Sequence, residues 1–215
     1  MLVRYWMAES PITVTPNTSL NVLLDLTHEH KVRRFPVLNE GELCGIVTIS
    51  DLYRIVSPKA VRAAILPDKY RERLEKHYVF QLMAKKIATC SINDHIEDVA
   101  YVMRKKKIGA LPVLKNNKLT GIITESDILD AFVKIAAAGK DSKRISLTFP
   151  LKEKTKEFYQ IVDLCHKYSV DILTLLTHPS EDNTMILMTL RIGGRNASQL
   201  VDALWKSHHQ ILTVE

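Results

Sequence analysis

The fold of this chain is decided by LCGIVTISD at residues 43–51 and by its second copy, LTGIITESD at residues 119–127. Each copy predicts an apolar β-strand that is entered through a glycine and left, through Thr-x-Ser-Asp, into an amphipathic helix. Serine or aspartate just before an apolar helical run is also ordinary helix-capping chemistry. One copy alone would therefore indicate only a helix start, whereas two copies indicate a repeated unit.

The repeat extends well beyond these two strands. Met83 follows Met7 by 76 positions, and the same interval separates Pro112 from Pro36 with no insertion or deletion. A fixed internal period is the first thing to settle in a new sequence. Two copies are too few for a solenoid. We therefore expect a pair packed about a pseudo-two-fold axis, in which equivalent strand ends face a shared cleft.

The order Met-Ala, Thr, amphipathic helix, apolar-Pro-Val-apolar and apolar-x-Gly-apolar-apolar-Thr-x-x-Asp resembles the CBS domain, and it occurs twice. This resemblance implies an α+β chain with a first CBS domain at 1–57, a helical linker at 58–78 and a second CBS domain at 79–139, each domain being a βαββα unit. Tandem CBS pairs, or Bateman modules, typically bind adenosine-containing ligands and regulate a domain or protein that is attached to them. The resemblance thus implies a regulatory, nucleotide-binding protein with an unidentified protein target.

Residues 143–215 follow a different pattern, with the predicted order strand, helix, strand, strand, helix, strand. This βαββαβ order has the right length for a ferredoxin-like domain. It resembles an ACT domain, and a CBS pair followed by an ACT-like domain is similar to the acetoin utilization type of CBS protein. Amino-acid-binding ACT domains usually carry a glycine after the first strand, where the loop at 150–155 here has none. We therefore expect assembly or a second signal from this domain, without binding of the standard amino acids.

A carboxylate at a strand end suits a ribose, because a vicinal diol can donate two hydrogen bonds to it, each contributing roughly 1.5–3 kcal/mol when charge-assisted. By resemblance, Asp51 and Asp127 hold ribose hydroxyls, and Thr48 and Thr124 bond ribose or phosphate oxygens. The resemblance places the adenine contacts at eight further positions: Thr13, Val14, Thr89, Cys90, Arg33, Arg34, Gly109 and Ala110. The implied ligand is AMP, ADP, ATP or S-adenosylmethionine.

The two copies differ just before their prolines. Arg33 and Arg34 offer guanidinium forks to a phosphate or a base, whereas Gly109 and Ala110 offer only backbone. Glu125, inside the second Thr-x-x-Asp, would repel a phosphate. We therefore expect two unequal sites. The alternative is a structural or oligomerisation scaffold whose clefts are vestigial and filled by side chains.

The net charge of +6 and the isoelectric point near 9.2 are compatible with a nucleic acid, an acidic surface or a phosphorylated small molecule. The basic residues are spread along predicted helices, as in Arg104–Lys107, and a charge run of this kind is usually a solvated helix face. The sequence has no zinc-finger spacing and no Arg/Gly-rich tail. Nucleic-acid binding is accordingly a less favoured alternative.

Catalytic and metal-binding motifs are absent from the sequence. The eight histidines are scattered, and no His-Glu-x-x-His, Cys-x-x-Cys or Gly-x-Ser-x-Gly occurs. His28 and His30 face different sides of a predicted helix, and His208-His209 lie at a helix end, where the helix dipole favours them. The sequence thus predicts no enzyme activity, no metal ligands and no cofactor beyond the regulatory ligand.

Three cysteines, Cys44, Cys90 and Cys165, are odd in number and lie within predicted strands or a helix. They are expected to be reduced and buried, which predicts a cytoplasmic protein. No apolar run approaches the ~20 residues that a membrane helix needs, and the first residues do not begin a secretory signal. A homodimer is the expected assembly, since two-fold dimers are the commonest soluble oligomers.

Overall fold

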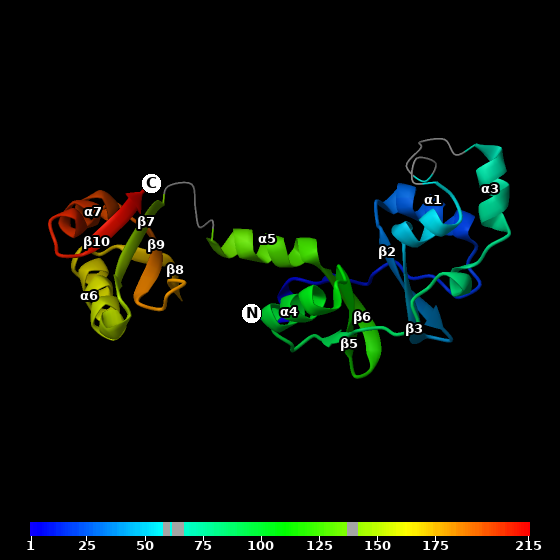
Figure 1. Cartoon of the computed structure of the whole chain (residues 1–215), viewed down its shortest axis with the longest axis horizontal. Coiled ribbons are helices and arrows are strands. Elements are labelled where there is room, and N and C mark those ends of the chain that lie inside the picture. Colours follow the sequence, from blue (N-terminus) through cyan, green and yellow to red (C-terminus); the bar gives the residue numbers. More distant parts are fainter. Residues whose placement is uncertain (58–60, 62–66, 137–141) are drawn as a thin grey trace. The chain divides into compact units, whose positions relative to one another are not determined.

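The computed structural model describes residues 1–57, 61, 67–136 and 142–215 (Figure 1). Parts of the predicted linker and the expected end of the second repeat at Gly139 lie outside these residues. The chain divides into two compact units, Met1–Ala131 and Phe132–Glu215. Among the described helices, none has the length and the apolar composition needed to cross a membrane.

The first unit contains both repeats. The elements before residue 79 are η1 (Val3–Tyr5), β1 (Ala8–Glu9), α1 (Leu20–His30), β2 (Arg34–Asn39), β3 (Glu42–Thr48), η2 (Ile49–Arg54) and α3 (Asp68–Glu75). Those of the second repeat are η3 (Val79–Gln81), β4 (Cys90–Ser91), α4 (Ile96–Lys106), β5 (Ala110–Lys115), β6 (Lys118–Thr124) and α5 (Glu125–Ala136). The hairpins β2–β3 and β5–β6 have the same antiparallel register and the same irregularity, as the repeat predicts.

The two repeats exchange their N-terminal segments. Strand β1 belongs to the first repeat but pairs with β6 of the second, where Ala8 lies opposite Ile122. The equivalent Ala84 of the second repeat forms an antiparallel bridge with Ile46 in β3 of the first. The apolar cores follow the same exchange, since Met83 packs in the core of the first repeat and Met7 in that of the second.

The two glycines of the repeated strands make room for this exchange. A Cβ added to Gly121 would lie 2.7 Å from Sδ of Met7 and 2.9 Å from the carbonyl oxygen of Ala8. A Cβ on Gly45 would likewise lie 2.7 Å from Sδ of Met83. Neither glycine has a positive φ, so close approach of the exchanged segment explains both.

Two local expectations are corrected by the structure. The sequence predicts that the two helices start at Ser-Asp, but they begin earlier, at Ile49 and Glu125. In the first repeat Thr48 is therefore the N-cap residue and Asp51 is the third residue of the helix. In the first repeat this element is a short 3-10 helix, whereas in the second repeat, with the same capping contacts, it is the α-helix α5. The first strand of the βαββα unit expected in the first repeat is reduced to one parallel bridge at Val14, since Pro11 and Pro16 on either side limit its pairing.

The second unit consists of the end of α5 and a βαββαβ region. Its elements are β7 (Lys143–Pro150), η4 (Leu151–Glu153), α6 (Lys154–Lys167), β8 (Asp171–Pro179), β9 (Met185–Gly193), α7 (Ala197–Trp205) and β10 (Gln210–Val214). The four strands form an antiparallel sheet in the order β10-β7-β9-β8. Alternate residues of β7 and β9 are buried, together with apolar residues of both helices, so the helices cover one face of the sheet.

Candidate functional site

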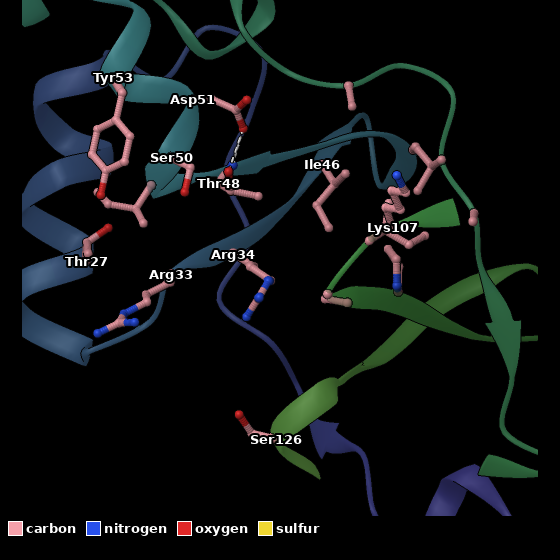
Figure 2. Close-up of a pocket in the computed structure, with 18 of the residues that line it drawn as sticks. Thr27, Arg33, Arg34, Ile46, Thr48, Ser50, Asp51, Tyr53, Lys107 and Ser126 are labelled. Carbon is pink, nitrogen blue, oxygen red and sulfur yellow. Dashed lines mark hydrogen bonds between the residues drawn. The ribbon is translucent and has the colours of Figure 1, made fainter. Parts of the chain in front are cut away.

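A large cavity lies within the first unit and is lined by both repeats (Figure 2). Its volume is about 2000 Å³. It is bordered by the C-terminal ends of α1 and α4, by β2 and β3, and by the turns that follow β3 and β6. Ligand pockets commonly measure about 300–1,000 Å³, so a nucleotide of any phosphate number has room here.

Asp51 lines this cavity and is held in a fixed orientation. Its Oδ2 accepts hydrogen bonds from the backbone N–H of Thr48 at 2.8 Å and from the Thr48 hydroxyl at 2.7 Å. Both bonds use the same oxygen, which leaves Oδ1 available to an incoming donor. The same contacts explain why Asp51 caps its helix, so capping and ligand binding are compatible roles for this residue. The Thr48 hydroxyl, by contrast, donates to Asp51.

Arg33 and Arg34 lie at the start of β2 and extend toward the open side of the cavity, with Ser126 of the second repeat beyond them (Figure 2). A Cβ added to Gly109 would lie only 2.5 Å from the Arg34 guanidinium and 3.0 Å from a carboxylate oxygen of Glu125. Gly109 therefore leaves space for Arg34. The four residues before the two prolines, expected at separate sites, line one cavity.

The cavity wall is strongly cationic. Asp51 is the single carboxylate among the described lining residues, and Glu125 lies just outside them beside Gly109. Six lining residues, by contrast, are lysines or arginines: Lys31, Arg33, Arg34, Lys86, Lys106 and Lys107. Low-dielectric walls of one charge sign focus the field inside a cleft. The wall therefore favours an anionic ligand.

Lys31 and Lys107 occupy equivalent positions in the two repeats. Each ends a helix in the left-handed conformation, with φ of 56° at Lys31 and 55° at Lys107. Glycine is the usual residue at such a position, because a side chain there costs about 1–2 kcal/mol. Both repeats thus carry an ammonium group at this cavity at a conformational cost.

The other predicted site residues lie elsewhere. Thr124 and Asp127 repeat the capping contacts of the first repeat, with both bonds to Asp127 Oδ2 at 2.7 Å, but they do not line this cavity. Val14 and Cys90 are 5% and 7% exposed, in equivalent bridging positions beside the hairpins. Cys90 lies in the apolar core of the second repeat, and this burial raises the pKa of its thiol to about 12. Thr13 is half-buried and Thr89 is exposed, and neither lines the cavity.

Several lining residues were missed by the sequence reasoning. They include Thr27, Lys31, Ser50, Tyr53, Lys86, Lys106, Lys107 and Ser126. A signal existed for one pair, because Lys31 and Lys107 are 76 residues apart and both follow an amphipathic helix. For Thr27 and Tyr53 no such signal exists, since only the packing of α1 beside η2 brings them to the cavity.

Comparison with known proteins agrees with this architecture. The CBS domain family matches residues 3–58 and 79–134. A CBS domain-containing protein of Dictyostelium discoideum is 35% identical over 140 residues, which are 63% of this chain and 93% of that protein. The structure of CBSX2 in complex with AMP is 25% identical, with a TM-score of 0.52, and the match covers 62% of this chain and 97% of that chain.

A further similar structure is that of a putative acetoin utilization protein, AcuB, from Vibrio cholerae. It is 25% identical with a TM-score of 0.52, and the match covers 64% of this chain and 93% of that chain. Because the family match covers both repeats, the chain belongs to the CBS domain family and contains a tandem CBS pair. CBS pairs are in general regulatory modules rather than catalytic ones.

Proposed function

We propose that this protein is a regulatory sensor that binds an adenine nucleotide in the cavity of its CBS pair. The observation that carries this proposal is the fixed carboxylate of Asp51 in a wall with six lysine and arginine side chains. Oδ1 of Asp51 accepts from the ribose diol, while Arg33, Arg34 and the two left-handed lysines bind phosphate oxygens. The similar CBSX2 structure contains AMP, which supports an adenosine ligand.

The charge of the wall selects among the expected ligands. AMP, ADP and ATP carry increasing negative charge, whereas S-adenosylmethionine has a sulfonium and an ammonium against one carboxylate. Placing that net positive ligand beside six cations is unfavourable, because like charges in a cleft repel. We therefore expect adenine nucleotides to bind, more tightly with each added phosphate, and S-adenosylmethionine to bind weakly.

The test compares thermal unfolding of the full chain with AMP, ADP, ATP and S-adenosylmethionine. A ligand at 100 times its Kd stabilises the folded state by about 2.7 kcal/mol, which raises Tm by several degrees for a protein of this size. Asp51→Ala should abolish most of this rise. Asp127→Ala is the matched control, since it loses the same cap, at about 0.5–2 kcal/mol, without lining the cavity.

Each alternative gives a different result in this experiment. If no nucleotide raises Tm, the clefts are vestigial and the scaffold alternative holds. If Asp51→Ala and Asp127→Ala lose equal amounts, the ribose assignment to this cavity is wrong. Binding of mixed nucleic acid that falls steeply with salt would favour the nucleic-acid alternative.

For the second unit we propose an ACT-like, ferredoxin-like domain that joins two chains, as in the acetoin utilization type of architecture. Its strand order supports this assignment, and its edge strand β8 exposes Ile172, Leu173 and Leu176. Edge strands with exposed apolar residues pair readily with a second copy. Light scattering should give a dimer of the 24.5 kDa chain, and Leu176→Lys should shift it toward the monomer. A wild-type chain that stays monomeric at micromolar concentration would refute this assembly.

A further inference from the structure

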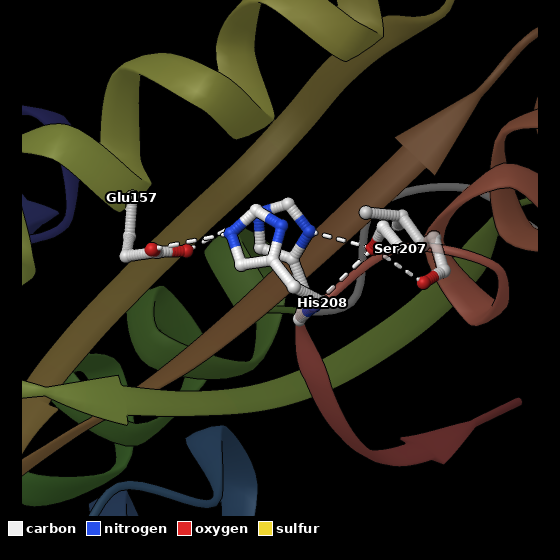
Figure 3. Close-up of polar contacts among 5 residues, drawn as sticks. Glu157, Ser207 and His208 are labelled. Atoms are coloured by element: carbon white, nitrogen blue, oxygen red, sulfur yellow. Dashed lines mark hydrogen bonds and ion pairs between the residues drawn. The ribbon is translucent and has the colours of Figure 1, made fainter.

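A second polar cluster lies in the C-terminal unit (Figure 3). Glu157, on the first turn of α6, meets His208 and His209, which precede β10. Glu157 Oε1 lies 3.4 Å from Nε2 of His208, and Oε2 lies 3.2 Å from Nε2 of His209. The two imidazole rings are stacked, with centroids 4.3 Å apart. Three nitrogen and oxygen ligand atoms therefore converge on one point, all within 4.8 Å of one another.

Glu157 is a buried charge that lacks an ordinary partner. Its side chain is only 4% exposed, and within the described part of the chain its ion-pair contacts are these two histidines, with no lysine or arginine. An isolated buried carboxylate is strongly unfavourable unless a cation compensates it. His208 is 62% exposed and supplies such a cation only when protonated. A cation held between Glu157 and the two imidazoles would compensate the carboxylate at this buried position.

The hydrogen bonds around Ser207 favour one tautomer of His209. The Ser207 hydroxyl donates its proton to the carbonyl oxygen of Leu204 at 2.6 Å, so it accepts from His209 Nδ1–H at 2.7 Å. Nε2 of His209 is then the unprotonated nitrogen, and its lone pair is free to bind a metal.

His209 Nε2 is left without a hydrogen bond by this arrangement. The atom is fully buried and forms none with the described residues, although Glu157 Oε2 is close to it. Two buried lone-pair atoms at this separation repel each other unless a cation lies between them. The hydrogen bond that His209 Nδ1–H donates to the Ser207 hydroxyl is the kind of supporting contact that orients metal-ligating histidines.

We propose that Glu157, His208 and His209 bind a divalent transition-metal ion with the ligand preference of Zn²⁺. Zn–N and Zn–O bonds of about 2.0–2.2 Å in a tetrahedral site place neighbouring ligand atoms roughly 3.3–3.5 Å apart. Each imidazole nitrogen lies 3.2–3.4 Å from one carboxylate oxygen of Glu157, and one ligand atom from each residue lies within 4.8 Å of the others, so small side-chain rotations bring three ligand atoms to that spacing. Two imidazoles exclude Ca²⁺ and Mg²⁺, which prefer all-oxygen sites.

A fourth coordination position opens into a small cavity beside the cluster. This cavity has a volume of about 380 Å³, and Gln160, one helical turn after Glu157, lines it with both histidines. Oε1 of Gln160 is buried and has no hydrogen-bond partner among the described residues. A water bound to the metal in this cavity could supply the donor that this oxygen lacks. The metal thus ties α6 to the segment before β10 and leaves one exchangeable position.

The test uses the full chain, stripped with a chelator and titrated with Zn²⁺ in competition with a chromophoric chelator. One Zn²⁺ should bind per chain and raise Tm. His208→Ala should weaken binding at least tenfold while leaving the Tm of the stripped protein unchanged, because His208 is mostly exposed. Ser207→Ala should weaken binding about 10–100-fold, as loss of supporting contacts does elsewhere. His178→Ala, an exposed histidine on β8, is the matched control.

X-ray absorption of the Zn²⁺-loaded chain separates this site from the cysteines. The proposal requires nitrogen and oxygen ligands and no sulfur, although the chain has three free thiols. Sulfur in the coordination sphere, or equal Zn²⁺ affinity of His208→Ala, Glu157→Gln and wild type, would overturn it. Glu157→Gln also removes the buried charge, so its stripped form should fold and still bind Zn²⁺ weakly.

Discussion

Replacing Lys107 with glycine should stabilise the fold and weaken nucleotide binding at the same time. Lys107 ends α4 at φ 55°, and the backbone N–H groups of Lys107 and Ile108 close the helix by donating to carbonyls of its last turn. This is the geometry in which glycine is normally found. The side chain projects to the cationic cavity, so the lysine is expected to be retained for binding rather than for stability.

The two effects can be sized separately. Glycine removes about 1–2 kcal/mol of left-handed strain and adds roughly 0.5–1 kcal/mol of backbone entropy cost, which leaves a net gain centred on about 0.75 kcal/mol. For a protein of this length that gain raises Tm by about 1–4 °C. Loss of one charge-assisted bond to a phosphate costs about 1.5–3 kcal/mol, which weakens nucleotide binding by about 10- to 150-fold.

Thermal unfolding of the apo chain and calorimetry with ATP measure the two effects. Lys107→Ala is the first control: it removes the charge but keeps a Cβ in the left-handed conformation, so affinity should fall without a rise in Tm. Lys105→Gly is the second, because it lies inside α4 and outside the cavity wall, and should lower stability by about 1 kcal/mol with unchanged affinity. A Lys107→Gly chain with lower Tm, or with wild-type affinity, would refute the reasoning.

Two further predictions concern the packing of the first unit and the thiols. Gly121→Ala should lower the free energy of unfolding, measured in urea, more than Gly45→Ala does. The new Cβ at position 121 would lie 2.9 Å from a backbone oxygen, whereas the new Cβ at position 45 would mainly meet a methionine side chain that can move. Equal losses of stability in the two variants would contradict this prediction. A thiol-specific chromogenic reagent should label Cys44 in the folded chain but reach Cys90 and Cys165 only on unfolding. Rapid labelling of all three thiols in the folded chain would contradict this burial. Burial also raises the pKa of the Cys90 thiol to about 12 and that of the Cys165 thiol to about 11, so both thiols ionise at lower pH in the unfolded chain than in the folded one. The free energy of unfolding should therefore fall as pH rises from about 9 toward those values.

Much of the fold was predictable because it depends on patterns of neighbouring residues in the sequence. The strands around Gly45 and Gly121, the hairpin turns and the βαββαβ order of the last region each follow from period-two alternation bounded by turn residues. The fixed interval between the repeats gave the equivalence of Asp51 and Asp127, which the structure bears out in identical capping contacts.

What could not be predicted depends on contacts between distant residues. No local pattern shows that Met7 packs in the second repeat, because this depends on the pairing of β1 with β6, which are more than 100 residues apart in the sequence. The pairing of Glu157 with His208 spans 51 residues, so motif spacing could not identify it. Gly109 was interpreted as offering only backbone, and the room that it also leaves for a guanidinium of the other repeat depends on a contact that no local pattern shows.

The exchanged N-terminal segments make the two repeats one cooperative unit. If the chain were cut between the repeats, each half would lose a segment that completes its own sheet and would retain a segment that completes the other. Neither half should then fold alone, but the two mixed together should reassemble by fragment complementation. A ligand that stabilises one repeat must for the same reason stabilise the other, since neither can open without releasing the strand it holds for its neighbour.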